Sequence, residues 1–184
     1  MNTQEIVWIF GSSASGKERF IERISSQEEP LLSKTLGWTD KKILVNMESV
    51  DWIGQLEEYD ADPVAIKRSE LIDVIANQAK QENVVILIKG QDVDLENDRP
   101  RILKNRLPNA HHRILFLHAS LDELYDRCKN KPWWKSKWTR DTVEEWLLYQ
   151  LKYIKSLQNE FDIATIRSEK GKEYIVMEFP PTIY

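Results

Sequence analysis

The sequence is poor in several features that would place it in other classes of protein. Its 184 residues include one cysteine, Cys128, so no disulfide can form within the chain and a reducing cytoplasm is the expected compartment. No apolar run approaches the ~18 residues that a membrane-spanning helix needs. Residues 1–5 have neither the basic region nor the apolar stretch of an export signal. We therefore expect one soluble domain, residues 1–184, with no membrane partner.

Neither sign of charge is in large excess. The chain has 26 Lys and Arg against 30 Asp and Glu, a formal net charge of -4. This acidity argues against a dedicated nucleic-acid binder, because affinity for duplexes rests largely on cations that neutralise phosphates. A hydrophobic content of 41% excludes a disordered chain. Composition leaves the oligomeric state open.

Short apolar runs alternate with longer amphipathic stretches. The apolar runs predict five strands, at residues 6–10, 42–47, 84–88, 114–117 and 161–166. Their apolarity is continuous, so both faces of the sheet should be covered. The amphipathic stretches predict helices at 17–25, 63–81, 98–106 and 121–130, and a last one that begins at Thr139 or Asp141 and ends near Asn159. This order predicts an α/β fold with three α/β/α layers, a mainly parallel five-stranded sheet and a possible C-terminal edge strand at 173–179.

The most informative segment reads Gly-Ser-Ser-Ala-Ser-Gly-Lys at residues 11–17. It matches the phosphate-binding pattern G-x-x-x-x-G-K, between a predicted strand and a predicted helix. The glycines let backbone N–H groups converge on an anion, and the helix start adds a positive dipole end. Lys17 is a candidate catalytic residue that would neutralise charge on the β- and γ-phosphates, unless the segment is a plain turn and Lys17 is merely solvated. The candidate nucleotide-binding residues are Gly11, Ser12, Ser13, Ala14, Ser15, Gly16, Lys17 and Glu18.

Glu18 departs from the usual continuation of this pattern. The motif normally continues with Ser or Thr, whose hydroxyl binds Mg²⁺. A carboxylate can also ligate Mg²⁺, but it would repel the phosphates if it pointed inward. Two interpretations are therefore open: Glu18 lies on the helix surface, or it is a metal ligand.

A second motif, at residues 121–131, adds to the phosphate-binding pattern. Together the two motifs make the chain resemble the P-loop kinases of the adenylate-kinase and shikimate-kinase type. These enzymes carry a helix of the form L-x-x-x-x-x-R-x-x-x-R after the fourth strand, and residues 121–131 match it with Lys131 in place of the second arginine. The resemblance implies that the chain uses ATP and Mg²⁺, that Arg127 packs on the base, and that Lys131 is a catalytic cation. It also implies an acid just beyond the third strand, for which Asp92 is the candidate metal-binding and catalytic residue.

Residues 127–140 contain six Lys or Arg and three tryptophans, Trp133, Trp134 and Trp138. This composition leaves three interpretations open. Residues 129–140 could form a lid that closes over the triphosphate, the tryptophans could stack on nucleic-acid bases, or they could pack inward beneath solvated charges.

We expect an ATP-dependent phosphotransferase that acts on a small-molecule phosphate acceptor. One alternative is a non-catalytic nucleotide-binding regulator, which Glu18 and the lack of an acid at the end of the third strand favour. Another is a nucleic-acid-end kinase or binder, which the Trp-rich segment favours and the acidic total opposes. Four basic residues could form an acceptor site or a solvated helix face: Arg99, Arg101, Lys104 and Arg106. We interpret His111 and His112 as loop residues and Cys128 as a packing residue.

Overall fold

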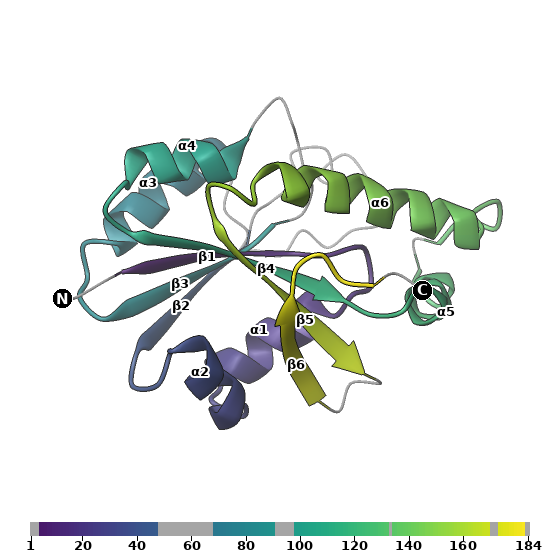
Figure 1. Cartoon of the computed structure of the whole chain (residues 1–184), viewed down its shortest axis with the longest axis horizontal. Helices are drawn as coiled ribbons and strands as arrows, with labels where there is room; N and C mark the ends of the chain where they lie inside the picture. Colours follow the sequence, from purple (N-terminus) through teal and green to yellow (C-terminus); the bar gives the residue numbers. More distant parts are fainter. Residues whose placement is uncertain (1–3, 48–67, 91–97, 133, 170–172, 183–184) are drawn as a thin grey trace.

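The computed structural model describes residues 4–47, 68–90, 98–132, 134–169 and 173–182 (Figure 1). These residues form a six-stranded sheet in the order β2-β3-β1-β4-β5-β6. The first five strands run parallel, and β6 runs antiparallel to β5 at one edge. The strands are β1 (Glu5–Phe10), β2 (Lys42–Met47), β3 (Val84–Lys89), β4 (His111–His118), β5 (Asp162–Glu169) and β6 (Glu173–Glu178).

Helices cover both faces of the sheet. Figure 1 shows α3, α4 and α6 on one face and α1 and α2 on the other, so the predicted three-layer α/β/α arrangement is confirmed. The sixth strand is the edge strand that the sequence predicts as possible. The helices are α1 (Lys17–Ser25), α2 (Pro30–Leu36), α3 (Arg68–Gln78), α4 (Arg99–Arg106), α5 (Leu121–Lys129) and α6 (Arg140–Ser156).

The continuous apolar runs are explained by burial on both sides of the central strands. All six residues of β1 and all six of β3 are buried. Because successive side chains alternate between faces, Trp8 and Phe10 pack in the core beneath α3, α4 and α6. Val7 and Ile9 pack in the second core, against α1 and α2. The central strand β1 is thereby fixed from both sides, and so is the segment that follows it.

Local sequence signals explain where several helices begin and end. Helix α6 has Thr139 as its N-cap residue, one of the two predicted positions, and the Thr139 N–H donates to Thr142 Oγ1 at 3.2 Å. Helix α2 was not predicted, although Pro30 opens it and Gly37, with a left-handed φ of 76°, closes it. The expectation of a loop at His111 and His112 was wrong, because both residues belong to β4.

Within the described residues, no helix is long and apolar enough to cross a membrane.

Candidate functional site

Residues 11–17 connect β1 to α1 at the carboxyl edge of the sheet, in the strand–loop–helix setting that the motif requires; we call them the phosphate loop. Three of them have positive φ angles: Gly11 (152°), Ala14 (62°) and Gly16 (93°). A Cβ atom at Gly11 would lie 2.5 Å from the carbonyl oxygen of Leu117 on β4. Only glycine fits there, because both the φ angle and the close approach exclude a side chain.

Lys17 folds back over the phosphate loop. Its Nζ donates hydrogen bonds to the carbonyl oxygens of Gly11 at 2.7 Å and Ser12 at 3.2 Å. The first hydrogen bond of α1 runs from Phe20 N to Gly16 O, so earlier N–H groups have no acceptor within the helix. An ammonium group and the positive end of a helix thus meet at one place, which suits an anion.

Ser15 adds a polar group inside the phosphate loop. The residue is fully buried, and its Oγ has no hydrogen-bond partner among the described residues. This hydroxyl lies on the inner side of the loop, because a Cβ atom at Gly11 would come within 2.6 Å of it. Buried hydroxyls are normally paired, so the loop has a donor that is left for another molecule.

Helix α5 supports the phosphate loop from behind. Arg127 Nη1 donates to the carbonyl oxygens of Ala14 at 3.3 Å and Ser15 at 3.5 Å, and its Nη2 pairs with Glu123. The buried thiol of Cys128 faces Ser13 O at 3.5 Å. Burial raises the pKa of this thiol to about 11, so Cys128 stays protonated and packs rather than reacts. Arg127 therefore lies at the phosphate loop, and its packing on a nucleotide base stays a prediction.

A charged pair joins the end of β3 to the start of α1. Lys89 is the last residue of β3, and its side chain is 6% exposed, whereas the side chain of its partner Glu18 is 76% exposed. The hydrogen bond from Lys89, with further attraction from Lys131 and Lys17, holds the pKa of Glu18 below its usual range. Lys89 thus contacts the Glu18 carboxylate directly, and Lys17 and Lys131 are near enough to attract it.

Comparison with solved structures found chains of similar fold. A chain of the PezAT chromosomal toxin–antitoxin system of Streptococcus pneumoniae aligns with a TM-score of 0.54 and 14% identity, over all of this chain and 75% of that one. A gluconokinase from Sinorhizobium meliloti aligns with a TM-score of 0.49 and 14% identity, over 90% and 83% of the two chains. A shikimate kinase from Bacteroides thetaiotaomicron aligns with a TM-score of 0.44 and 14% identity, over 88% and 85%.

The likeness to the PezAT chain shows that the two chains share this α/β fold. Neither the comparison with protein-family models nor the comparison with curated proteins found a match.

The described residues do not fit the magnesium site of a P-loop protein. In such proteins the ion is held by the hydroxyl that follows the loop lysine and by an acid from the Walker-B strand. Here Glu18 replaces the hydroxyl and is paired with an ammonium group, and β3 ends in that ammonium group, on Lys89. No cluster of three metal-ligating side chains occurs in the part of the chain that the structure describes. Asp92, the predicted ligand, lies outside the described residues.

The Trp-rich segment between α5 and α6 is held by a chain of aromatic contacts. Trp134 meets Tyr125 of α5 edge to face at 5.8 Å and Trp138 at 5.6 Å between ring centroids, and Trp138 meets Trp146 of α6 at 5.2 Å. These contacts favour inward packing over stacking on nucleic-acid bases. The lid at 129–140 stays a prediction, and Trp133 lies outside the described residues.

Arg101 and Lys104 of α4 bind Glu160, in the turn between α6 and β5. Arg101 donates from Nε to Glu160 Oε1 at 2.8 Å, and Lys104 binds the Glu160 carbonyl and lies over the Phe161 ring. These contacts support the structural interpretation of Arg101 and Lys104 rather than a role in gripping an acceptor.

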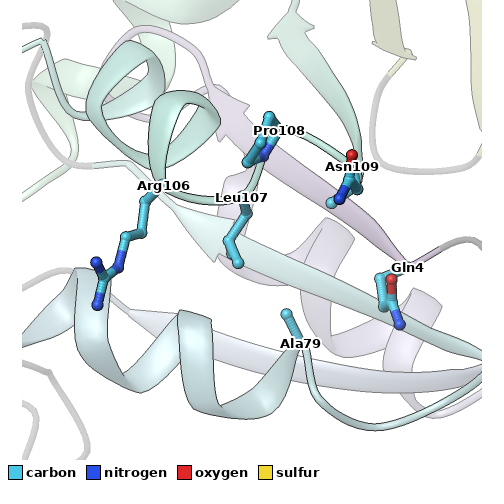
Figure 2. Close-up of a pocket in the computed structure, with 7 residues that line it drawn as sticks. Gln4, Ala79, Arg106, Leu107, Pro108 and Asn109 are labelled. Atoms are coloured by element: carbon cyan, nitrogen blue, oxygen red, sulfur yellow. The ribbon is translucent and has the colours of Figure 1, made fainter.

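A cavity of about 170 Å³ lies at the opposite, amino-terminal edge of the sheet (Figure 2). Of the residues that the sequence analysis singles out, Arg106 lines it. Its walls come from the ends of α3 and α4 and the turn into β4, and its lining residues are Gln4, Ala79, Arg106, Leu107, Pro108, Asn109 and Ala110.

Proposed function

We propose that the chain binds ATP at the phosphate loop and transfers its γ-phosphoryl group to a small-molecule acceptor. The observation that carries this proposal is the Lys17 ammonium, which lies over a loop with three positive φ angles and opens α1 at the carboxyl edge of a parallel sheet. Ligands of open α/β sheets bind at this edge. In the reaction, the γ-phosphorus gains a bond to an acceptor hydroxyl oxygen, whose proton passes to water, as its bond to the bridging oxygen breaks and ADP leaves.

The residues around the phosphate loop have distinct roles in this proposal. Backbone N–H groups of residues 11–17 hold the β- and γ-phosphates, and Ser15 Oγ adds a donor. Lys17 releases the Gly11 and Ser12 carbonyls to bind the phosphates and stabilises the charge that develops during transfer. Lys131 adds positive charge from the end of α5, and Arg127 packs beside the base. The sequence predicted Mg²⁺ held through Asp92. We assign no step to a metal, because β3 ends in the ammonium group of Lys89 and this group is paired with Glu18.

A second candidate function is a nucleotide-binding regulator that transfers no phosphate. The observation that favours it is the Glu18–Lys89 pair, which occupies the positions of a magnesium-binding hydroxyl and acid. A coupled assay for ADP release, run across a panel of hydroxylated metabolites, separates the two. ADP release that depends on one acceptor supports the kinase, and tight ATP binding with no release for any acceptor supports the regulator.

Calorimetric titration with ATP tests the binding step that both candidates share. In the Lys17→Ala variant, we expect affinity to fall at least about tenfold, because hydrogen bonds to charged groups contribute about 1.5–3 kcal/mol. The matched control is Lys34→Ala, which removes an exposed lysine of α2 on another part of the surface and should leave the affinity unchanged. No ATP binding by the wild-type protein, or equal affinity in Lys17→Ala, would contradict the proposal.

A further inference from the structure

Lys89 is an unusual residue for its position. Strand β3 is otherwise made of Val, Ile and Leu, and Lys89 itself is 5% exposed. Removing an ammonium group from water is costly, and an apolar residue would complete this strand at no such cost. The ion pair with Glu18 offsets little of this cost, because the Glu18 carboxylate is largely in solvent, where water weakens the attraction. Stability alone therefore gives no reason for a lysine here.

The position of Lys89 suggests what the charge does. Residue Ile9 of β1 pairs with Lys89 in the parallel ladder, and the phosphate loop begins two residues after Ile9. Lys89 reaches across to Glu18, in the first turn of α1, on the side of the sheet where α1 packs. This is the place between strand end and helix start where a P-loop protein holds its metal ion. Here the chain supplies a cation of its own.

We infer that the Lys89 ammonium takes the place of the metal ion, so that the phosphate loop binds nucleoside polyphosphate in its metal-free form. This inference rests on the proposed function, since it assumes that ATP binds at the loop. When the ligand arrives, a phosphate oxygen replaces the Glu18 carboxylate as the partner of Lys89, and the exposed Glu18 side chain turns into solvent. The unpartnered Ser15 hydroxyl is an independent sign that the adjoining loop is built to receive a polar ligand.

The test is calorimetric titration with ATP in excess EDTA and, separately, in excess Mg²⁺. We expect wild-type affinity in EDTA to equal or exceed that in Mg²⁺. In EDTA, Lys89→Met should bind at least about tenfold more weakly, because it loses a charge-assisted contact. Glu18→Gln should bind more tightly, because it removes the competitor for Lys89. The control is Lys41→Met, which breaks a lysine–glutamate pair (Lys41–Glu5) at the other edge of the sheet and should change neither affinity.

A gain-of-function variant keeps the test decisive if Lys89→Met fails to fold. The double variant Glu18→Thr with Lys89→Asp restores a hydroxyl and a strand-end acid, and its ATP binding should become dependent on Mg²⁺. Wild-type binding that requires Mg²⁺ would overturn the inference and leave the proposed function standing. Absence of ATP binding in both EDTA and Mg²⁺ would overturn the two together.

Discussion

The two edges of the sheet use the same kinds of charged residue in opposite ways. At the amino-terminal edge, the buried carboxylate of Glu5 accepts a hydrogen bond from Trp38 Nε1 at 2.9 Å and forms ion pairs with Arg113 at 2.9 Å and Lys41 at 3.5 Å. At the carboxyl edge, the buried group is a cation, Lys89, and its carboxylate partner lies at the surface.

The difference separates a structural cluster from a binding site. Around Glu5, several donors converge on one anion, and the protein itself satisfies the charge. Around the phosphate loop, Lys89 pairs with one exposed carboxylate that Lys17 and Lys131 also attract. Under the proposed function, an anion from outside completes this arrangement. Burial and pairing alone do not distinguish the two edges, whereas the sign of the buried charge and the exposure of its partner do.

The sharpest way to break this comparison is to remove the buried anion. Glu5→Gln should lower the free energy of unfolding by about 3 kcal/mol, because it leaves the partners of a buried ion pair without their anion. Urea denaturation measures the loss, and titration of the folded variant with ATP should show unchanged affinity. The matched variant at the other edge, Glu18→Gln, should cost less stability, because its carboxylate is exposed. A larger loss in Glu18→Gln than in Glu5→Gln would remove the distinction.

Glycine substitutions sharpen the comparison between a built site and an ordinary turn. Gly11→Ala should lower the free energy of unfolding by about 2 kcal/mol and abolish ATP binding, since its Cβ would meet the Leu117 carbonyl at 2.5 Å. Gly37→Ala at the end of α2 also has a positive φ but has nothing within 4 Å, so it should cost about 1 kcal/mol and leave binding intact. Chemical denaturation and calorimetry measure both. Equal losses of ATP binding would show that the close approach at Gly11 is unimportant.

Two buried histidines of β4, one near each edge, give the smallest expected effect. Nε2 of His112 lies 2.8 Å from the Leu107 carbonyl and Nε2 of His118 lies 3.2 Å from the Thr182 carbonyl. A carbonyl only accepts, so each Nε2 carries a proton, and burial lowers the pKa of both rings. The unfolded chain therefore takes up protons first, and stability should fall as the pH drops below about 6.5.

The loss from these histidines should be on the order of 1 kcal/mol between pH 7 and pH 5. Urea denaturation across this range measures it, and the double variant His112→Gln with His118→Gln should flatten the profile. A slope that persists in the double variant would assign the pH dependence to other groups.

Much of the fold could be predicted because short stretches of sequence specify its strands and helix ends. Continuous runs such as 84–88 predict strands buried on both faces, and Thr139 marks the start of α6. Helix α2 was missed because it has only seven residues, too few for a clear period. His111 and His112 were misplaced because β4 begins with polar residues, ahead of the apolar run at 114–117.

Only some of the residues of the candidate site could be predicted from the sequence, for a different reason. The phosphate loop is contiguous, so its pattern predicts it directly. The pairing of Glu18 with Lys89 joins residues 71 positions apart and depends on β3 lying beside β1. Local periodicity carries no information on that strand order. A lysine directly after a run of apolar residues was the available signal, since a strand end at the carboxyl edge points to a ligand site.

The enclosure of Cys128 also has a practical consequence. This thiol is the sole cysteine of the chain, is fully buried behind the phosphate loop and stays protonated at neutral pH. A cysteine engineered onto the surface would therefore be the one thiolate that a maleimide dye or spin label meets in the folded protein. Distance measurements by fluorescence or electron resonance could be made in the wild-type background, with no need to delete the native thiol first.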